Sequence, residues 1–189
     1  MRIIDKPANG VYPFPDTGDI LHYLENSFPE IRKLINGLPP EKLYYRYQEN
    51  KWSIKEILVH LVDDERIYAY RALCFARNEK ISLPGFDQDA YTRWSGADKR
   101  ESGNIFHEYE AVRHATIALF EGLPEDSLDK VGMADNKNST ARALLWHIAG
   151  HELHHINFIK AYYLLTCPGC SWHMLVCFSL DTKPTFMPS

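Results

Sequence analysis

Apolar side chains recur at intervals of three and four residues along most of the chain, and this spacing constrains the fold more than any other feature. Such intervals place the apolar side chains on one face of an α-helix. The first helical segment carries Ile20, Leu21, Leu24, Phe28, Ile31, Leu34, Ile35 and Leu38. Pro29 lies inside it and predicts a kink or a separated first turn, whereas Gly37 and the two prolines that follow Leu38 end it.

A second helix is predicted from its start signal. Ser53 stands as the N-cap with Glu56 three residues later, which is a capping box, and Trp52 and Ile57 flank it as a hydrophobic staple. The apolar stripe that follows continues to about Arg77. We therefore expect a helix of about six turns that begins directly after Ser53.

Two further helices are expected after a long connection. One covers residues 102–121, and the other begins near Ser139 or Thr140 and continues to about Thr166. The connection, residues 81–101, contains the aromatics Phe86, Tyr91 and Trp94, which could wall a pocket or simply pack.

The four helices predict an all-α fold, a four-helix bundle with a long crossover between its second and third helices. Residues 124–138 are polar and are expected to form a loop, and no strand-like alternation competes within residues 16–166. We expect one domain over residues 1–166, followed by a tail over residues 167–189. Cys167 and Cys170 in that tail could bind zinc or form a redox pair, or could belong to a simple turn that ends the last helix.

Composition excludes several classes of protein. The 189 residues carry 21 basic and 25 acidic side chains, and a net charge of −4 argues against nucleic acid or an anionic membrane as a partner. No stretch of about 18 apolar residues is present that could span a bilayer, and none near Met1 reads as a secretory signal. The four cysteines are unevenly spaced, so a disulfide scaffold is not expected. We therefore expect a cytoplasmic location.

The last helix carries four histidines within nine residues: His147, His151, His154 and His155. At 100° and 1.5 Å per residue, His151 and His155 lie about 40° apart around the helix and about 6 Å apart along it. Two imidazoles so placed can bind one metal ion, and neutral imidazole is the commonest metal ligand in proteins. The pair His147 and His151 has the same spacing, and His151 and His154 are nearly as close, so spacing alone selects two of the four, with His151 common to every option.

An additional ligand is available upstream. His60 lies between the core positions Ile57 and Leu61, where an unpaired polar ring would be costly. Its alternative role is that of a core histidine whose ring is satisfied by a carbonyl group.

Residues 151–155 also spell H-E-x-x-H, the zinc-protease signature in which the glutamate is the general base. A protease of that type needs a third ligand downstream, but position 161 is Ala161, and Asp181 is the only acidic residue after His155. A protease is therefore not favoured. Glu152 lies about 100° around the helix from His151 and remains a weak candidate for a general base.

Several motifs in order resemble the DinB-like superfamily of metal-binding four-helix bundles. They are residues 47–58 leading into His60, residues 63–66, 76–77 and 83–91, and residues 149–155. The resemblance implies an up-down-down-up bundle with a three-histidine site. Carried onto this chain, the ligands are His60, His151 and His155, while His147 and His154 become neighbours of the site, with His154 in a supporting position.

Such a site implies one divalent transition metal, and histidine ligands suit zinc, nickel or iron(II). Three histidines leave coordination positions open for water or a substrate atom. Asp64, one turn after His60, could orient the His60 ring. The resemblance favours a metal-dependent transferase that uses a low-molecular-weight thiol on a small-molecule substrate. A metal-dependent hydrolase and a non-catalytic metal-binding stress-response module are the alternatives, and a homodimer is expected.

Overall fold

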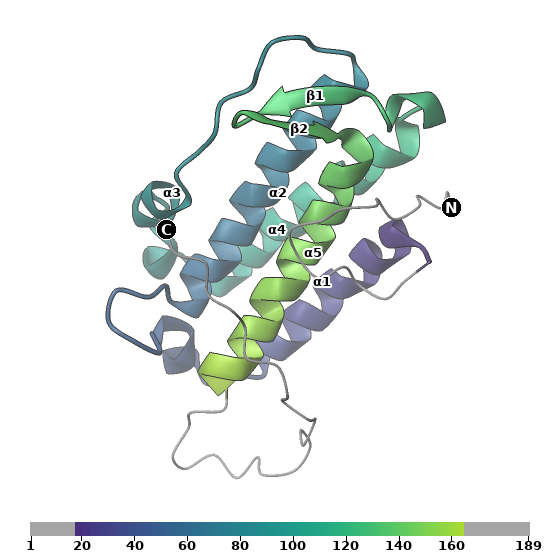
Figure 1. Cartoon of the computed structure of the whole chain (residues 1–189). Coiled ribbons are helices and arrows are strands. Elements are labelled where there is room, and N and C mark those ends of the chain that lie inside the picture. The colour runs from purple at the N-terminus through teal and green to yellow at the C-terminus, as the bar shows by residue number, and fades with distance from the viewer. Residues whose placement is uncertain (1–17, 165–189) are drawn as a thin grey trace, which may run out of the picture.

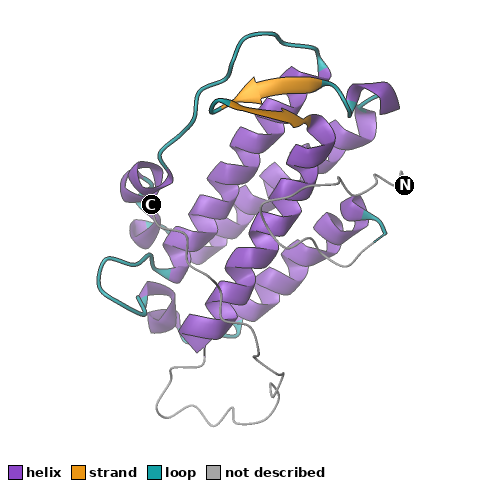
Figure 2. Cartoon of the chain, viewed as in Figure 1, coloured by secondary structure: helices purple, strands orange, loops and turns teal. Residues whose placement is uncertain are grey.

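The computed structural model describes residues 18–164 and shows a bundle of four long helices with a short helix and a β-hairpin beside them (Figures 1 and 2). This confirms the predicted fold class. The elements are α1 (Ile20–Asn36), α2 (Ile54–Ala76), α3 (Gln88–Trp94), α4 (Ser102–Gly122), β1 (Val131–Ala134), β2 (Lys137–Thr140) and α5 (Ala141–Ile159), followed by a π-helical turn over Lys160–Leu164.

Helix starts follow local capping chemistry. The Ser53 side chain accepts a hydrogen bond from the Glu56 amide, and the Glu56 side chain accepts one from the Ser53 amide, as the capping box predicts. The Thr140 side chain accepts from the amide of Ala143 and thereby begins α5.

The predicted separation of the first turn at Pro29 does not occur. Helix α1 is continuous through Pro29, although a proline cannot donate the usual backbone hydrogen bond. Leu24 and Phe28 before it and Ile31 after it are all buried in the bundle. Burial of apolar side chains on both sides of the proline offsets the missing hydrogen bond and keeps the helix in one piece.

The core consists of two clusters, one at each end of the bundle. One gathers the start of α1, the ends of α2 and α4, and the start of α5. The other gathers the end of α1, the starts of α2 and α4, and the end of α5. Helices α1 and α5 therefore run one way and α2 and α4 the other, which confirms the up-down-down-up order.

This order requires the long crossover. Because α2 and α4 are parallel, the chain must return along the length of the bundle between them, and residues 77–101 do so with α3 on the way (Figure 1). The crossover is bound to the hairpin by two backbone hydrogen bonds, from the Leu83 amide to Met133 at 2.9 Å and from the Asp135 amide to Leu83 at 3.0 Å.

The expectation of no strands was wrong for residues 131–140. Strands β1 and β2 pair antiparallel, with Val131 opposite Thr140 (Figure 2). Asp135 and Asn136 form the turn between them, both at positive φ, as in the two-residue turns that suit hairpins. Strands of four residues are too short to show a convincing alternation, and the turn dipeptide was the signal available in the sequence.

Within residues 18–164, every helix is too short or too polar to serve as a membrane span. The predicted domain boundary after residue 166 and the pair Cys167 and Cys170 lie outside the described residues.

Candidate metal centre

Three histidines from two facing helices bring their Nε2 atoms together. The Nε2 atom of His151 lies 3.1 Å from Nε2 of His60 and 3.0 Å from Nε2 of His155. His60 and His151 are 2% and 3% exposed, and His155 is partly buried. The structure thus brings together the three residues that the family resemblance selects.

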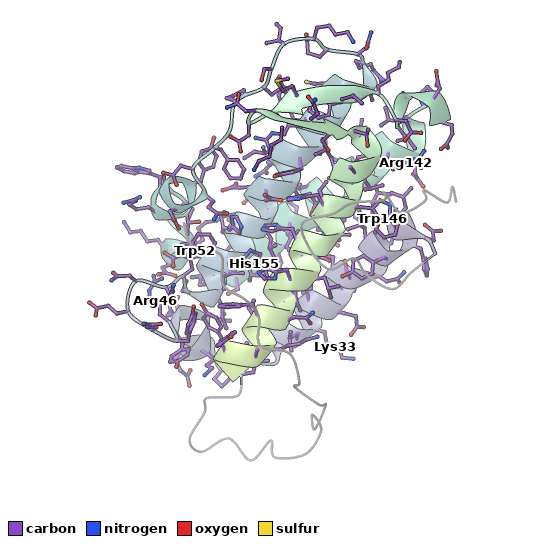
Figure 3. All side chains as sticks on the ribbon, viewed as in Figure 1. Lys33, Arg46, Trp52, Arg142, Trp146 and His155 are labelled. Carbon is purple, nitrogen blue, oxygen red and sulfur yellow. The ribbon has the colours of Figure 1, made fainter. Side chains whose placement is uncertain are left out.

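Helix geometry explains this convergence. Helices α2 and α5 pack side by side and antiparallel, so the first turns of α2 face the last turns of α5. His151 and His155 are one turn apart on the same face of α5. Trp52, directly before α2, adds an aromatic wall, because its ring centroid lies 4.7 Å from that of His60 and 6.4 Å from that of His155. Figure 3 shows the side chains of Trp52 and His155 next to each other.

Burial keeps two of these rings uncharged. Loss of solvent around His60, together with the nearby His151, lowers the pKa of His60 to about 4. The same two causes, followed by His60 itself, lower the pKa of His155 to about 2. Both rings are therefore neutral at pH 7, and each has a nitrogen lone pair available for a metal ion.

Asp64 lies against the outer ring nitrogen of His151. Its Oδ2 atom lies 3.1 Å from Nδ1 of His151 and 3.4 Å from Nε2 of His147. Burial alone would raise the pKa of Asp64, but contacts with His147 and His151 more than offset this effect, so the pKa falls below its usual value. A carboxylate at this position favours the tautomer with the proton on Nδ1 of His151, which leaves the lone pair on Nε2 facing the other two rings.

This contact corrects one sequence-based expectation. Asp64 was expected to orient His60, one turn before it on α2, but its close contacts are with His147 and His151 of α5. The reason is that the α2 face carrying Asp64 packs directly on α5, where His147 and His151 lie opposite it.

The remaining histidines of α5 lie beside the three-nitrogen cluster. The ring of His147 stacks on Tyr68, with centroids 3.7 Å apart and planes 6° from parallel. His147 also forms a second close group with Asp64 and His151. His154 is exposed, and its ring centroid lies 5.2 Å from that of His155. The supporting role expected of His154 stays a prediction.

Glu152 belongs to a different cluster. Its Oε2 atom accepts hydrogen bonds from the Tyr109 hydroxyl, at 2.7 Å, and from the Arg113 guanidinium. Arg113 also pairs with Glu65, and all four side chains are buried. The weak candidate for a general base is therefore a partner in a buried ion-pair network, because one residue step around α5 turns it away from His151.

The donor set fits a transition metal. Metal–nitrogen bonds to histidine are about 2.0–2.1 Å long, so two nitrogens on one ion can be up to about 4 Å apart. The observed separations of 3.0 and 3.1 Å lie within that limit. A site with only three protein ligands leaves coordination positions for water or a substrate atom.

Sequence reasoning missed two aromatic contributions to the site. Trp52 was assigned only to the helix start, and Tyr68 was not singled out, although it lies on the same α2 stripe as His60 and Asp64, at intervals of four residues. Four-residue spacing of polar and aromatic side chains on α2 was the signal available.

Comparison with known proteins agrees with the fold and the site. The family model of the DinB superfamily matches residues 23–159. A protein of Oceanobacillus iheyensis named "putative metal-dependent hydrolase" is 27% identical over 148 residues, which cover 77% of this chain and 84% of that protein.

Two solved structures from Bacillus subtilis share the fold. YfiT, described as a probable metal-dependent hydrolase with an unusual four-helix bundle topology, superposes with a TM-score of 0.65 at 13% identity, covering 83% of this chain and 96% of YfiT. The DinB-like protein YjoA gives a TM-score of 0.54 at 18% identity, covering 77% and 90%. Because the family model extends from the first turn of α1 to the last residue of α5, the chain belongs to the DinB superfamily.

Proposed function

We propose that the protein is a metal-dependent enzyme in which His60, His151 and His155 hold one divalent transition metal. The convergence of three Nε2 atoms, with Asp64 behind His151, is the observation that carries this proposal. When bound, such an ion acts as a Lewis acid that lowers the pKa of a water or thiol in contact with it. Histidine-only ligation suits zinc, nickel or iron(II).

The protein's own groups position and shield the site. Asp64 holds the His151 ring through Nδ1, so that its other nitrogen keeps one direction and one tautomer. Trp52 packs against His60 and limits the access of water from that side. The substrate is then a small molecule that takes a coordination position left open by the three histidines.

Hydrolysis of a small molecule is the first candidate reaction, and the names of the Oceanobacillus protein and of YfiT support it. Thiol transfer to an electrophile is the second. One observation supports thiol transfer: the two carboxylates near the site are already engaged. Glu152 is bound to Arg113 and Tyr109, and Asp64 contacts His147 and His151. With neither carboxylate available as a base, a thiol loses its proton more readily than water does, since the pKa of a thiol, about 8.5, is far closer to neutrality.

Metal content tests the site. Elemental analysis of untagged protein purified without chelators is expected to give about one equivalent of a transition metal. His60→Ala and His155→Ala are each expected to lose it, because two remaining imidazoles bind far more weakly than three. His114→Ala removes an exposed histidine of α4 and is expected to keep the metal. A wild type that stays metal-free after loading with zinc, nickel and iron(II) contradicts the proposal.

Turnover then separates the reactions. Metal-loaded protein that cleaves model esters or amides without any thiol is a hydrolase. Metal-dependent consumption of cysteine or another small thiol with a model electrophile identifies a thiol transferase. Metal binding without either reaction identifies a non-catalytic metal-binding module.

A further inference from the structure

Arg71 in α2 is a buried cation to which the described residues 18–164 offer no carboxylate partner. It is 5% exposed, and its Nη2 donates one hydrogen bond to the Pro84 carbonyl at 2.9 Å. Its guanidinium carbon lies 4.9 Å from the Tyr68 ring centroid and 5.9 Å from that of Phe86. Within residues 18–164, no acidic side chain forms an ion pair with it.

The other deeply buried arginine shows the usual arrangement. Arg113 is 2% exposed and is bound by two carboxylates, those of Glu65 and Glu152. Removing a charge from water is costly unless an opposite charge or a full set of hydrogen bonds replaces the water. A guanidinium has five N–H donors, and one carbonyl with two aromatic faces satisfies Arg71 only in part. Arg71 therefore has N–H donors left to bind an anion, whereas those of Arg113 are already bound by two carboxylates.

Arg71 also lines a hollow of about 310 Å³ between α2 and the crossover. The other side chains around it include Arg66, Tyr70, Leu83, Phe86 and Tyr91. Arg66 already pairs with Glu108, which leaves Arg71 as the lining cation without an acidic partner in the described part of the chain. The volume is at the lower end of the range of small-molecule sites, about 300–1,000 Å³, and its apolar and aromatic wall is typical of them.

The hollow and the candidate metal centre lie along the same face of α2. Arg71 is eleven residues after His60, which is three turns and about 16 Å along the helix. Stacked rings join the two places, because Arg71 lies over Tyr68, Tyr68 stacks on His147, and His147 lies 5.6 Å from His151 between ring centroids. A small molecule with an anionic group about 16 Å from its reacting atom has the length to reach both.

We propose that Arg71 binds a carboxylate or phosphate group of the substrate in this hollow, with Phe86 and Tyr91 against its apolar part. The link between this anion site and a reaction rests on the proposed function, whereas anion binding by Arg71 does not. The planar guanidinium fork binds either anion through two parallel hydrogen bonds.

Calorimetric titration of metal-loaded protein with succinate and, separately, with inorganic phosphate tests the proposal at constant ionic strength. Wild type is expected to bind at least one of them, and Arg71→Gln is expected to weaken that binding about tenfold or more, since a charge-assisted hydrogen bond is lost. Arg66→Gln, on the same hollow, is expected to bind almost as wild type. Arg71→Lys keeps the charge and is the variant of choice if Arg71→Gln does not fold; it is expected to bind more weakly than wild type because it lacks the fork.

The outcomes are distinct. If Arg71→Gln loses the binding of succinate alone, the group recognised is a carboxylate. If it loses the binding of phosphate alone, the group is a phosphate. No binding by wild type, or equal binding by wild type, Arg71→Gln and Arg71→Lys, overturns the proposal. If the wild-type protein takes up no metal but binds the anion, and Arg71→Gln does not bind it, the anion site stands and the proposed function falls.

Discussion

Asp64 acts on the candidate metal centre indirectly, because it contacts Nδ1 of His151 and not any of the three converging Nε2 atoms. Its Oδ2 atom lies against Nδ1 of His151, and His147 approaches the same oxygen from the preceding turn of α5. A carboxylate in this position raises the basicity of the ring and keeps it from rotating. Its contribution is therefore expected in metal affinity rather than in the fold.

Asp64→Asn keeps the size of the side chain and removes its charge. We expect metal affinity to fall about 10- to 100-fold, as for other partners that orient a ligating histidine. Competition with a chromogenic chelator measures it. Asp63→Asn is the matched control, because Asp63 is the neighbouring residue and forms its ion pair with Arg66, at 3.9 Å. Equal losses in the two variants would mean that Asp64 does not support the site.

Glu152 shows how a motif can mislead at this scale. The letters H-E-x-x-H match a zinc protease, yet the glutamate side chain is bound to Tyr109 and Arg113. Residues that are adjacent in a helix point about 100° apart, so a carboxylate next to a metal-binding histidine reaches the metal only if the helix is rotated to suit. Helix α5 turns that side toward α1 and α4 instead.

At the scale of elements, the β-hairpin supports the upper end of the bundle shown in Figure 1. It joins α4 to α5 and binds the crossover through Leu83. Gly132 in β1 lies so close to α2 that a Cβ atom there would collide with the Phe75 ring. The absence of a side chain at Gly132 is thus what allows the hairpin to cover the end of α2.

Gly132→Ala is expected to lower the free energy of unfolding by about 1–3 kcal/mol, because the added methyl group must displace a buried aromatic ring. Chemical denaturation measures the change. Gly103→Ala in α4 is the control, since a Cβ atom there meets nothing within 4 Å, and alanine is the better helix former. We expect Gly103→Ala to be neutral or stabilising, and a similar loss in both variants would contradict the packing argument.

At the scale of the whole molecule, Arg113 connects all four long helices. It donates to Glu65 of α2, to the Leu24 carbonyl and Ser27 hydroxyl of α1, and to Glu152 of α5, while it belongs to α4 itself. Its nitrogen Nη1 lies 2.7 Å from the Leu24 oxygen and 2.9 Å from Oγ of Ser27. Such a network stabilises one arrangement of the helices over others only when every member is present.

Arg113→Leu removes the cation and leaves two buried carboxylates without their shared partner. We expect the free energy of unfolding to fall by about 3–5 kcal/mol, as when one member of a buried ion pair is deleted. Arg66→Leu is the control, because its pair with Glu108 is at the surface and is worth at most about 1 kcal/mol. If the two variants unfold at the same denaturant concentration, the network contributes no more than a surface pair.

The sequence by itself determined the helices and the spacing of the histidines. The capping box at Ser53 and Glu56, the cap at Thr140 and the apolar intervals predicted where α2 and α5 begin, because these signals depend on contacts within a few residues. The one-turn spacing of His151 and His155 was equally local. The family resemblance, rather than the spacing, selected His60, His151 and His155 together.

Tertiary structure alone determined which side chains of different elements contact one another. The rotation of α5 against α2 placed Asp64 on His151 instead of His60 and turned Glu152 toward Arg113. The return of the crossover along α2 buried Arg71 beside Phe86, and the hairpin formed where residues 131–140 could pack on Phe75. These outcomes depend on contacts between residues far apart in the chain, and local spacing carries no information about them because the packing of whole helices determines which faces meet.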